Sequence, residues 1–149
     1  MNHIKLRKKA RQFLLQSLYQ WQISAEDPHA LKMQLLEEFD PTIFDVEYFD
    51  RVLFGVIQHQ AELDQLFIPL LMRPFEQVDN IELAALRLAT FELVYCIDIP
   101  YRVVINEALN LTKKFGATDS YKFMNQILDQ LAKQLRSTEW SAHADQTAL

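Results

Sequence analysis

Apolar residues recur every three to four positions over most of this 149-residue chain, which is the spacing of helices that bury one face. The first predicted helix spans about residues 5–23. Its inward stripe comprises Ala10, Phe13, Leu14, Leu18 and Trp21. A second helix is predicted after Asp27 and Pro28, because these residues supply a cap and a first-turn proline.

The middle of the chain continues the helical pattern. A third helix is predicted from Asp45, and Gly55 lies inside it. Glycine there costs about 1 kcal/mol relative to alanine, so either a neighbouring helix or a ligand approaches closely, and we favour helix packing. A short irregular helix follows over residues 64–72. Asp79 and Glu82 then form a capping box that opens a strong helix to about residue 97.

Residues 103–129 join two amphipathic helices through a tight corner. Gly116 is expected to end the first helix in the left-handed conformation, and Thr118 or Asp119 to cap the second. The stripes of the two helices are Val104, Ala108, Leu111 and Phe115, then Met124, Ile127, Leu128, Leu131 and Leu135. The basic and aromatic side chains left near the turn are Lys113, Lys114, Tyr121 and Lys122. Together with the amides of a helix start, such a corner can bind a phosphate backbone.

The composition narrows the fold class. Only two glycines leave little material for the tight hairpins of an all-β protein. We predict an all-α fold: a single compact domain of about seven helices, arranged as two packed helical subdomains. The domain is expected over residues 1–137. The apolar period disappears in residues 138–149, which are predicted to form a disordered tail.

The cysteine content bears on the compartment. The single cysteine, Cys96, lies in an apolar helical run, which favours a small buried hydrophobe in a reducing environment. The N-terminal region lacks the pattern of a secretory signal, and no run of about 18 apolar residues is found. These features predict a cytoplasmic protein.

The net charge of −5 combines two opposite regions. Residues 1–25 carry five cations and no acid, so the rest of the chain carries a net charge of −10. The cations are Lys5, Arg7, Lys8, Lys9 and Arg11. Over a Debye length of roughly 8 to 10 Å, this local cluster matters more than the total charge. On a helix these residues would form one cationic surface, although a solvated helix start is the plain alternative.

The sequence offers no constellation for catalysis. The four histidines show no metal-ligand spacing with one another or with Cys96. Two glycines cannot build a phosphate-cradling loop or a strained nucleophile elbow. We therefore expect no enzyme activity, no metal and no cofactor.

Binding of single-stranded nucleic acid is a better match to the chemistry. Such binding needs cations along the backbone and rings on which bases stack, at about 1 to 3 kcal/mol per base. Both are present, since Tyr121 and Phe123 flank Lys122. Phe123 also fits a core position at the start of the last helix, and this alternative remains open.

Several segments resemble the NusB family of transcription antitermination factors. They are KARQFLLQSLYQWQ (9–22), ELAALRLATFEL (82–93), VINEAL (104–109) and DSYKF (119–123). The resemblance implies an adaptor that binds the boxA element of nascent, single-stranded ribosomal RNA. It also implies a binding partner, a ribosomal small-subunit protein that acts as NusE, within an antitermination complex on RNA polymerase.

The resemblance and the basic cluster together give the candidate site. The RNA-binding candidates are Lys5, Arg7, Lys8, Lys9, Arg11, Arg73, Glu76, Asp119, Lys122 and Phe123. The residues implied for NusE contact are Tyr19 and Glu82. Lys8 and Lys9 stand where the family has arginines, which keeps the charge but loses the planar fork that grips phosphate.

Two other functions fit the same residues less well. A protein-interaction scaffold would use the cations to grip an acidic partner without recognising RNA sequence. Some RNA methyltransferases carry a NusB-like domain, but they need a further catalytic domain with a glycine-rich cofactor loop, for which this chain is too short.

Overall fold

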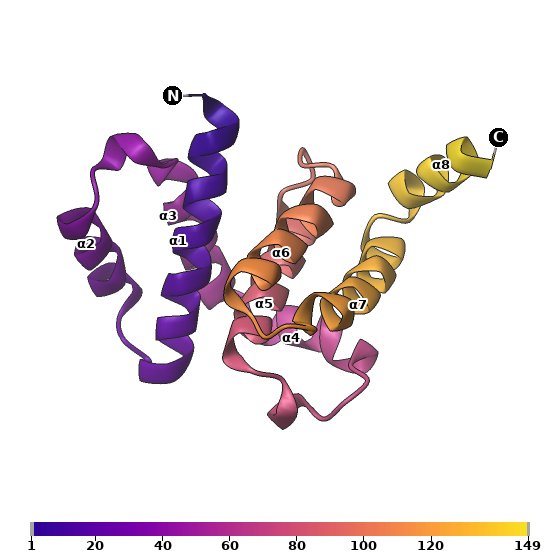
Figure 1. Ribbon diagram of the computed structural model, residues 1–149, viewed down its shortest axis with the longest axis horizontal. Helices are drawn as coiled ribbons and strands as arrows, with labels where there is room; N and C mark the ends of the chain where they lie inside the picture. The colour runs from indigo at the N-terminus through magenta and orange to yellow at the C-terminus, as the bar shows by residue number, and fades with distance from the viewer. Residues whose placement is uncertain (1, 149) are drawn as a thin grey trace.

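The computed structural model describes residues 2–148, with side chains through residue 144 (Figure 1). Within these residues the chain forms eight α-helices and three short 3-10 helices, and no strand. The α-helices are α1 (His3–Ser24), α2 (Pro28–Glu38), α3 (Val46–Gln58), α4 (Gln60–Phe67), α5 (Asn80–Tyr95), α6 (Tyr101–Phe115), α7 (Ser120–Leu135) and α8 (Ser137–Ala148). The 3-10 helices are η1 (Pro41–Ile43), η2 (Ile68–Leu70) and η3 (Phe75–Gln77). Among the described helices, none is both long enough and apolar enough to cross a bilayer.

Short polar side chains fix where the helices begin. Asp27 accepts a hydrogen bond from the backbone N of His29 at 3.0 Å, and Pro28 occupies the first turn of α2. The capping box of α5 is complete, because the Glu82 amide donates to Asp79 at 2.8 Å and the Asp79 amide donates to Glu82 at 3.2 Å. Each such cap contributes about 1 kcal/mol. The predicted starts of α2 and α5 are confirmed.

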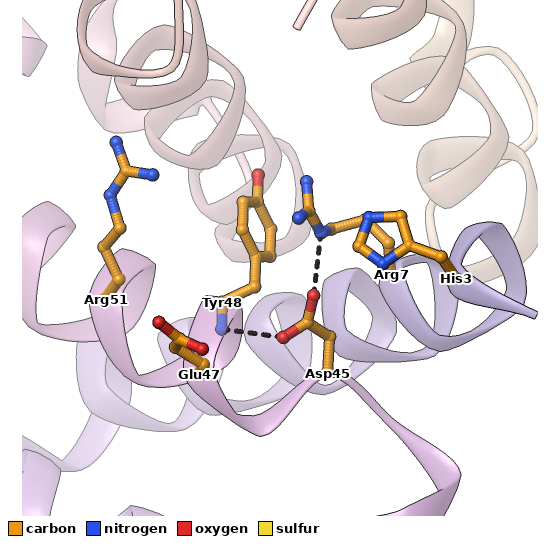
Figure 2. Close-up of a pocket in the computed structure, with 6 residues that line it drawn as sticks. All are labelled: His3, Arg7, Asp45, Glu47, Tyr48 and Arg51. Atoms are coloured by element: carbon orange, nitrogen blue, oxygen red, sulfur yellow. Dashed lines mark hydrogen bonds and ion pairs between the residues drawn. The ribbon is translucent and has the colours of Figure 1, made fainter. Parts of the chain in front are cut away.

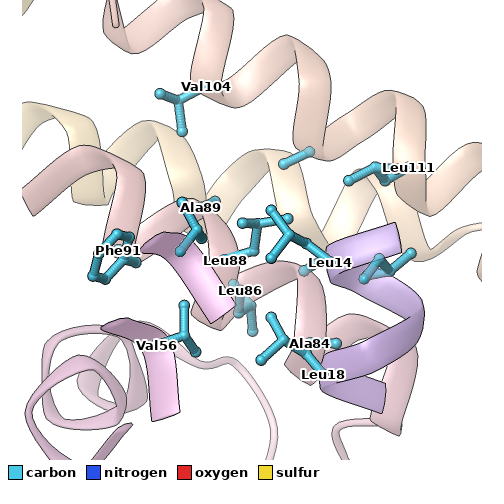
Figure 3. Packing of buried hydrophobic residues seen from close by; sticks show 14 of the residues in the cluster. Leu14, Leu18, Val56, Ala84, Leu86, Leu88, Ala89, Phe91, Val104 and Leu111 are labelled. Carbon is cyan, nitrogen blue, oxygen red and sulfur yellow. The ribbon is translucent and has the colours of Figure 1, made fainter. Parts of the chain in front are cut away.

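Helix α5 is the centre of the molecule. Its residues 82–93 are all buried, and it packs on α1, α3, α4, α6 and α7. A helix that is apolar around most of its circumference is typical of such a position. Alanines Ala84, Ala85 and Ala89 let the neighbouring helices come close, and Figure 3 shows leucines of α1 and α6 gathered around them. In Figure 1, α1, α2 and α3 lie on one side of α5, while α6 and α7 lie on the other. The predicted all-α single domain is confirmed, and its two helical groups share one core helix.

Gly55 marks the closest approach of α3 to α5. A Cβ atom placed on Gly55 would collide with the ring of Phe91 on α5. Any larger residue would therefore force the ring of Phe91 or the helix that carries it to move. The interpretation of Gly55 as a packing position is confirmed.

Arg136, the residue after α7, ties the end of the chain to the end of α5. Its guanidinium donates to the carbonyl oxygens of Glu92, Leu93 and Cys96 at 3.2, 2.7 and 3.1 Å. It also donates to the carbonyl of Ile99 at 3.0 Å. The carbonyls of Glu92 and Cys96 also accept from the amides of Cys96 and Ile99. These bonds hold the bend between α5 and α6.

The segment after Ser137 differs from the expected disordered tail, because it forms α8. Glu139 accepts from Arg136 and from the backbone N of Tyr101, both at 2.8 Å, so it satisfies an amide at the start of α6. The ring of Tyr101 also contacts His143 edge-on. The apolar period is weak in this segment, and the helix docks through these polar contacts together with Trp140, which packs against the core.

Candidate nucleic-acid interface

The basic residues of α1 point in different directions. Arg7 faces α3, where its Nε lies 3.2 Å from a carboxylate oxygen of Asp45 and its guanidinium covers the ring of Tyr48. Lys8 faces α6, where its Nζ lies 2.9 Å from Glu107. Lys9 lies over the ring of Phe13, which itself packs against α2 through Phe39. The expectation of one cationic surface on this helix is therefore wrong, because neighbouring residues on a helix are about 100° apart.

Arg11 is buried in the core. Its Nε lies 3.0 Å from Glu92 of α5, and the two side chains are only 5% and 2% exposed. Tyr48 donates a second hydrogen bond to Glu92. Burial raises the pKa of the Glu92 carboxyl. Burial is the largest single influence on Arg11 and opposes its charged form, but Glu92, Tyr48 and Glu107 together outweigh it, so the pKa of Arg11 is raised.

The assignment of Arg11 to an RNA surface needs correction on this geometry, since its charge is neutralised by Glu92 inside the fold. A sequence signal for this burial exists. Arg11 is three, four and seven residues before Leu14, Leu15 and Leu18, which are all fully buried, so it lies on the apolar stripe of α1.

A hollow of about 250 Å³ opens beside Arg7. Figure 2 shows Asp45 between Arg7 and the backbone N of Tyr48, from which it accepts a hydrogen bond. Arg51 and Glu47 lie on the other wall. Two carboxylates balance two guanidinium groups here, so this hollow has little net attraction for phosphate.

The corner between α6 and α7 has a different character. Lys113 lies over the ring of Tyr121 at 4.9 Å from its centroid, and Lys114 over the ring of Phe115 at 5.4 Å. A cation over a ring keeps its N–H donors available to another acceptor. Lys122 is 3.5 Å from Asp119, and both side chains are more than two-thirds exposed. A pair so exposed is weak and leaves Lys122 accessible.

Gly116 ends α6 without adopting the left-handed conformation. Its φ of −93° and ψ of 179° are extended, and among the described residues only Ala25 has a positive φ. The expectation for Gly116 is therefore wrong. Glycine is needed for space instead, because a Cβ there would lie 2.7 Å from the carbonyl oxygen of Thr112. Asp119 is the N-cap residue of α7, but its side chain makes no capping hydrogen bond.

Arg73 joins the corner from the loop before α5. It makes a two-pronged contact with Glu82 at 2.9 and 2.8 Å, and its guanidinium stacks 3.8 Å from the ring centroid of Phe123. Arg73 and Glu82 face residues 117–120 across an open hollow of about 450 Å³. Glu76 lies exposed on η3, three residues after Arg73. The structure thus brings Arg73, Glu82, Asp119 and Phe123 into one neighbourhood.

A shallow groove between α1 and α6 connects the two basic regions. Lys8 and Gln12 of α1 line a hollow of about 100 Å³ with Glu107, Asn110 and Lys114 of α6. Glu107 and Lys114 are seven residues apart, or about 10 Å along the helix. We call the surface from Lys8 through Lys114 to the corner the α1–α6 track.

Other candidates fall along or beside this track. Lys5 is exposed and precedes Lys8 by three residues, so it shares the face of α1 that carries Lys8 and Gln12. Tyr19, half-buried, is seven residues beyond Gln12 on that face. Sequence reasoning missed Gln12 and Asn110, although Gln12 follows Lys8, and Asn110 precedes Lys114, by four residues.

An all-helical domain with basic side chains displayed over aromatic rings has the features of a nucleic-acid-binding adaptor. Comparison with known proteins gives its family, since the NusB family model matches residues 8–133. The chain belongs to the NusB family.

Individual relatives agree over nearly the whole chain. A transcription antitermination protein NusB from Teredinibacter turnerae is 45% identical over 137 residues, which is 91% of this chain and 93% of that protein. The structure of NusB from T. maritima aligns with a TM-score of 0.76 at 32% identity, covering 86% of this chain and 91% of that one. A structure of the antitermination factors NusB and NusE in complex with double-stranded RNA aligns with a TM-score of 0.75 at 25% identity, covering 85% of this chain and 96% of that one.

Proposed function

We propose that this chain is an RNA-binding transcription antitermination factor. It binds boxA-type single-stranded nascent ribosomal RNA together with a ribosomal small-subunit protein acting as NusE, as part of a complex on RNA polymerase. Membership of the NusB family and the likeness to a NusB–NusE–RNA assembly support the proposal. A protein that acts on transcribing RNA polymerase is expected in the cytoplasm.

The observation that carries the proposal is the arrangement of cations at the corner. Lys113 and Lys114 each lie over an aromatic ring, so their charges are displayed near apolar faces. Arg73 also stacks on a ring, while Glu82 holds its guanidinium in place. Single-stranded RNA presents phosphates and unstacked bases together, and a surface of this kind meets both. The α1–α6 track extends the corner toward Lys8.

The candidate residues divide by role within this proposal. The phosphates along the track are contacted by Lys5, Lys8, Lys122 and Arg73. Arg7 and Lys9 lie beside the track and add to its positive electrostatic potential. Phe123 offers a ring whose other face is held by Arg73. The carboxylates of Asp119 and Glu76 accept hydrogen bonds from exocyclic amines of bases. Arg11 contributes by stabilising the fold and does not contact the RNA.

NusE contact is assigned to Tyr19 and Glu82. Glu82 is only 2% exposed and holds Arg73, so it acts on the partner and on the RNA through the same ion pair. The function is binding without catalysis. NusE binding and RNA binding should therefore strengthen each other, because each needs Arg73 to be held in an ordered position.

Competition binding tests the proposal. A boxA-type RNA is titrated against a scrambled RNA of equal length and a double-stranded RNA, with and without NusE. We expect preference for the boxA-type single strand, and tighter binding when NusE is present. Equal affinity for all three RNAs and for an acidic polypeptide would replace this function by that of a charge-gripping scaffold.

A further inference from the structure

A further hollow lies at one end of the α1–α6 track, away from the corner between α6 and α7. It has a volume of about 280 Å³ and is formed by the first turns of α1, the bend between α5 and α6, and the start of α6. This volume is just below the range of roughly 300 to 1,000 Å³ typical of small-molecule sites, and it suits one flat group rather than a folded element. We call it the terminal slot.

Four apolar residues form part of the walls of the terminal slot. Ile4 and Val103 face it from α1 and α6, with 65% and 40% of their surfaces exposed. Ile99 and Pro100 form the side contributed by the bend. Side chains of this kind sandwich unstacked bases in proteins that extract them from a helix. The exposed apolar surface therefore has a natural occupant in an unpaired base.

Charged groups stand around these walls. Arg7 and Lys8 line the slot from α1. Arg7 is paired with Asp45. Lys8 is paired with Glu107, which also lines the slot, but the side chain of Lys8 is 47% exposed and keeps further N–H donors for a phosphate. Asp98, which is exposed, lines it from the bend. Cations beside an apolar slot suit the phosphates on either side of an inserted base, and a carboxylate accepts from an exocyclic amine.

The slot continues the surface already described. Lys8 and Glu107 line both the terminal slot and the groove between α1 and α6. A strand that follows the cations from the corner past Lys114 reaches the slot without leaving the surface. This continuity favours RNA over a separate peptide as the occupant.

The wall is also held rigidly. Ile99 is 7% exposed, its amide donates to Cys96 at 2.9 Å, and its carbonyl accepts from Arg136 at 3.0 Å. A preformed wall loses little entropy when a ligand binds.

We propose that the terminal slot binds one unstacked base of the RNA, with Lys8 and Arg7 beside the flanking phosphates. The proposal rests on the proposed function and adds a base-specific contact at the far end of the track.

Abasic scanning tests it on the full chain. A short boxA-type RNA is synthesised with a single abasic site at each position in turn, and affinities are measured by fluorescence anisotropy. For the natural protein we expect one position near an end of the bound segment to cost about fivefold or more in affinity. Val103→Trp fills the slot, so it should weaken the intact RNA by a similar factor and remove the sensitivity to that abasic position. Ile4→Ala should give a smaller loss at the same position.

Two controls keep the outcomes separate. Ile97→Ala changes an apolar residue of the same bend that is more exposed than Ile4 or Val103 but does not line the slot, and it should leave the scan unchanged. Lys114→Ala tests the track itself.

If Lys114→Ala weakens RNA binding but Val103→Trp retains the natural abasic profile, the slot proposal is overturned and the proposed function stands. If neither variant affects RNA binding, both are overturned. Loss of NusE binding by Val103→Trp with RNA binding intact would make the slot a peptide site and also overturn the proposal.

Discussion

The basic residues of α1 and those of the α6–α7 corner differ in what they contact. On α1, Arg7, Lys8 and Arg11 each meet a carboxylate. At the corner, Lys113 and Lys114 lie over aromatic rings instead. A carboxylate neutralises a cation, whereas a ring polarises toward it and leaves its charge to act on other groups. The number of cations in a segment therefore does not by itself give the strength of its electrostatic field.

The difference separates charge used for folding from charge available for binding. The pair of Arg11 and Glu92 joins α1 to the central helix, and the pair of Arg7 and Asp45 joins α1 to the start of α3. Both connect helices far apart in the sequence. Lys122 and Asp119, by contrast, are neighbours on one exposed turn. In the described part of the chain, Lys113, Lys114 and Lys122 of the corner make no ion pair to a distant helix, whereas three of the five cations of α1 do.

The largest effect is expected for Arg11→Ala. The substitution leaves Glu92 buried without its cation, which should lower the free energy of unfolding by about 3 to 5 kcal/mol. Urea denaturation followed by circular dichroism measures the change. Lys122→Ala is the matched control and should stay within about 0.5 kcal/mol of the natural protein. A loss for Arg11→Ala as small as that of the control would show that this cation is not structural.

The contrast between these regions was only partly predictable from the sequence. Helix positions, the capping box and the packing role of Gly55 follow from local patterns, and the structure confirms them. Whether a cation is paired or free to bind depends on acids that lie far along the chain, such as Glu92 and Glu107. The periodicity of the sequence does not predict such pairs. The position of Arg11 on the apolar stripe of α1 indicates that it is buried, whereas no pattern in the sequence predicts that Lys8 pairs with Glu107.

The second prediction compares RNA binding at the two ends of the track. Replacing Lys113 and Lys114 together by alanine should reduce the salt dependence of RNA affinity by roughly 0.7 for each phosphate that the protein no longer neutralises. Arg7→Ala should change that slope less, because Asp45 already neutralises the guanidinium. Filter binding at several salt concentrations decides. A larger slope change for Arg7→Ala than for the double variant would reverse the comparison.

The smallest effect is expected at Asp119. Asp119→Asn removes an exposed carboxylate beside Lys122 and keeps the side-chain size. RNA affinity should fall by at most about fivefold, since a hydrogen bond from a base amine to a carboxylate is worth about 1 kcal/mol more than one to an amide oxygen, and loss of the repulsion with phosphate offsets part of this difference. The same titration measures it, with Glu37→Gln on α2 as the control for removal of an exposed acid elsewhere. Tighter RNA binding by Asp119→Asn would mean that this carboxylate repels the phosphates and accepts no hydrogen bond from RNA.

The site was less predictable than the fold, for a physical reason. Arg73 comes to Phe123 only because the loop before α5 folds against the start of α7, a contact across 50 residues. The groove residues Gln12 and Asn110 are ordinary polar side chains, and they gain significance only when α1 and α6 lie side by side.

The bonds of Arg136 set an order of events during synthesis. This residue is made 40 residues after Cys96, whose carbonyl it binds. While the nascent chain is still shorter, the bend between α5 and α6 has only its own backbone bonds, from the amides of Cys96 and Ile99, and lacks the four bonds of this guanidinium. The bend therefore gains its full set of hydrogen bonds only after a residue distant in the chain has been translated.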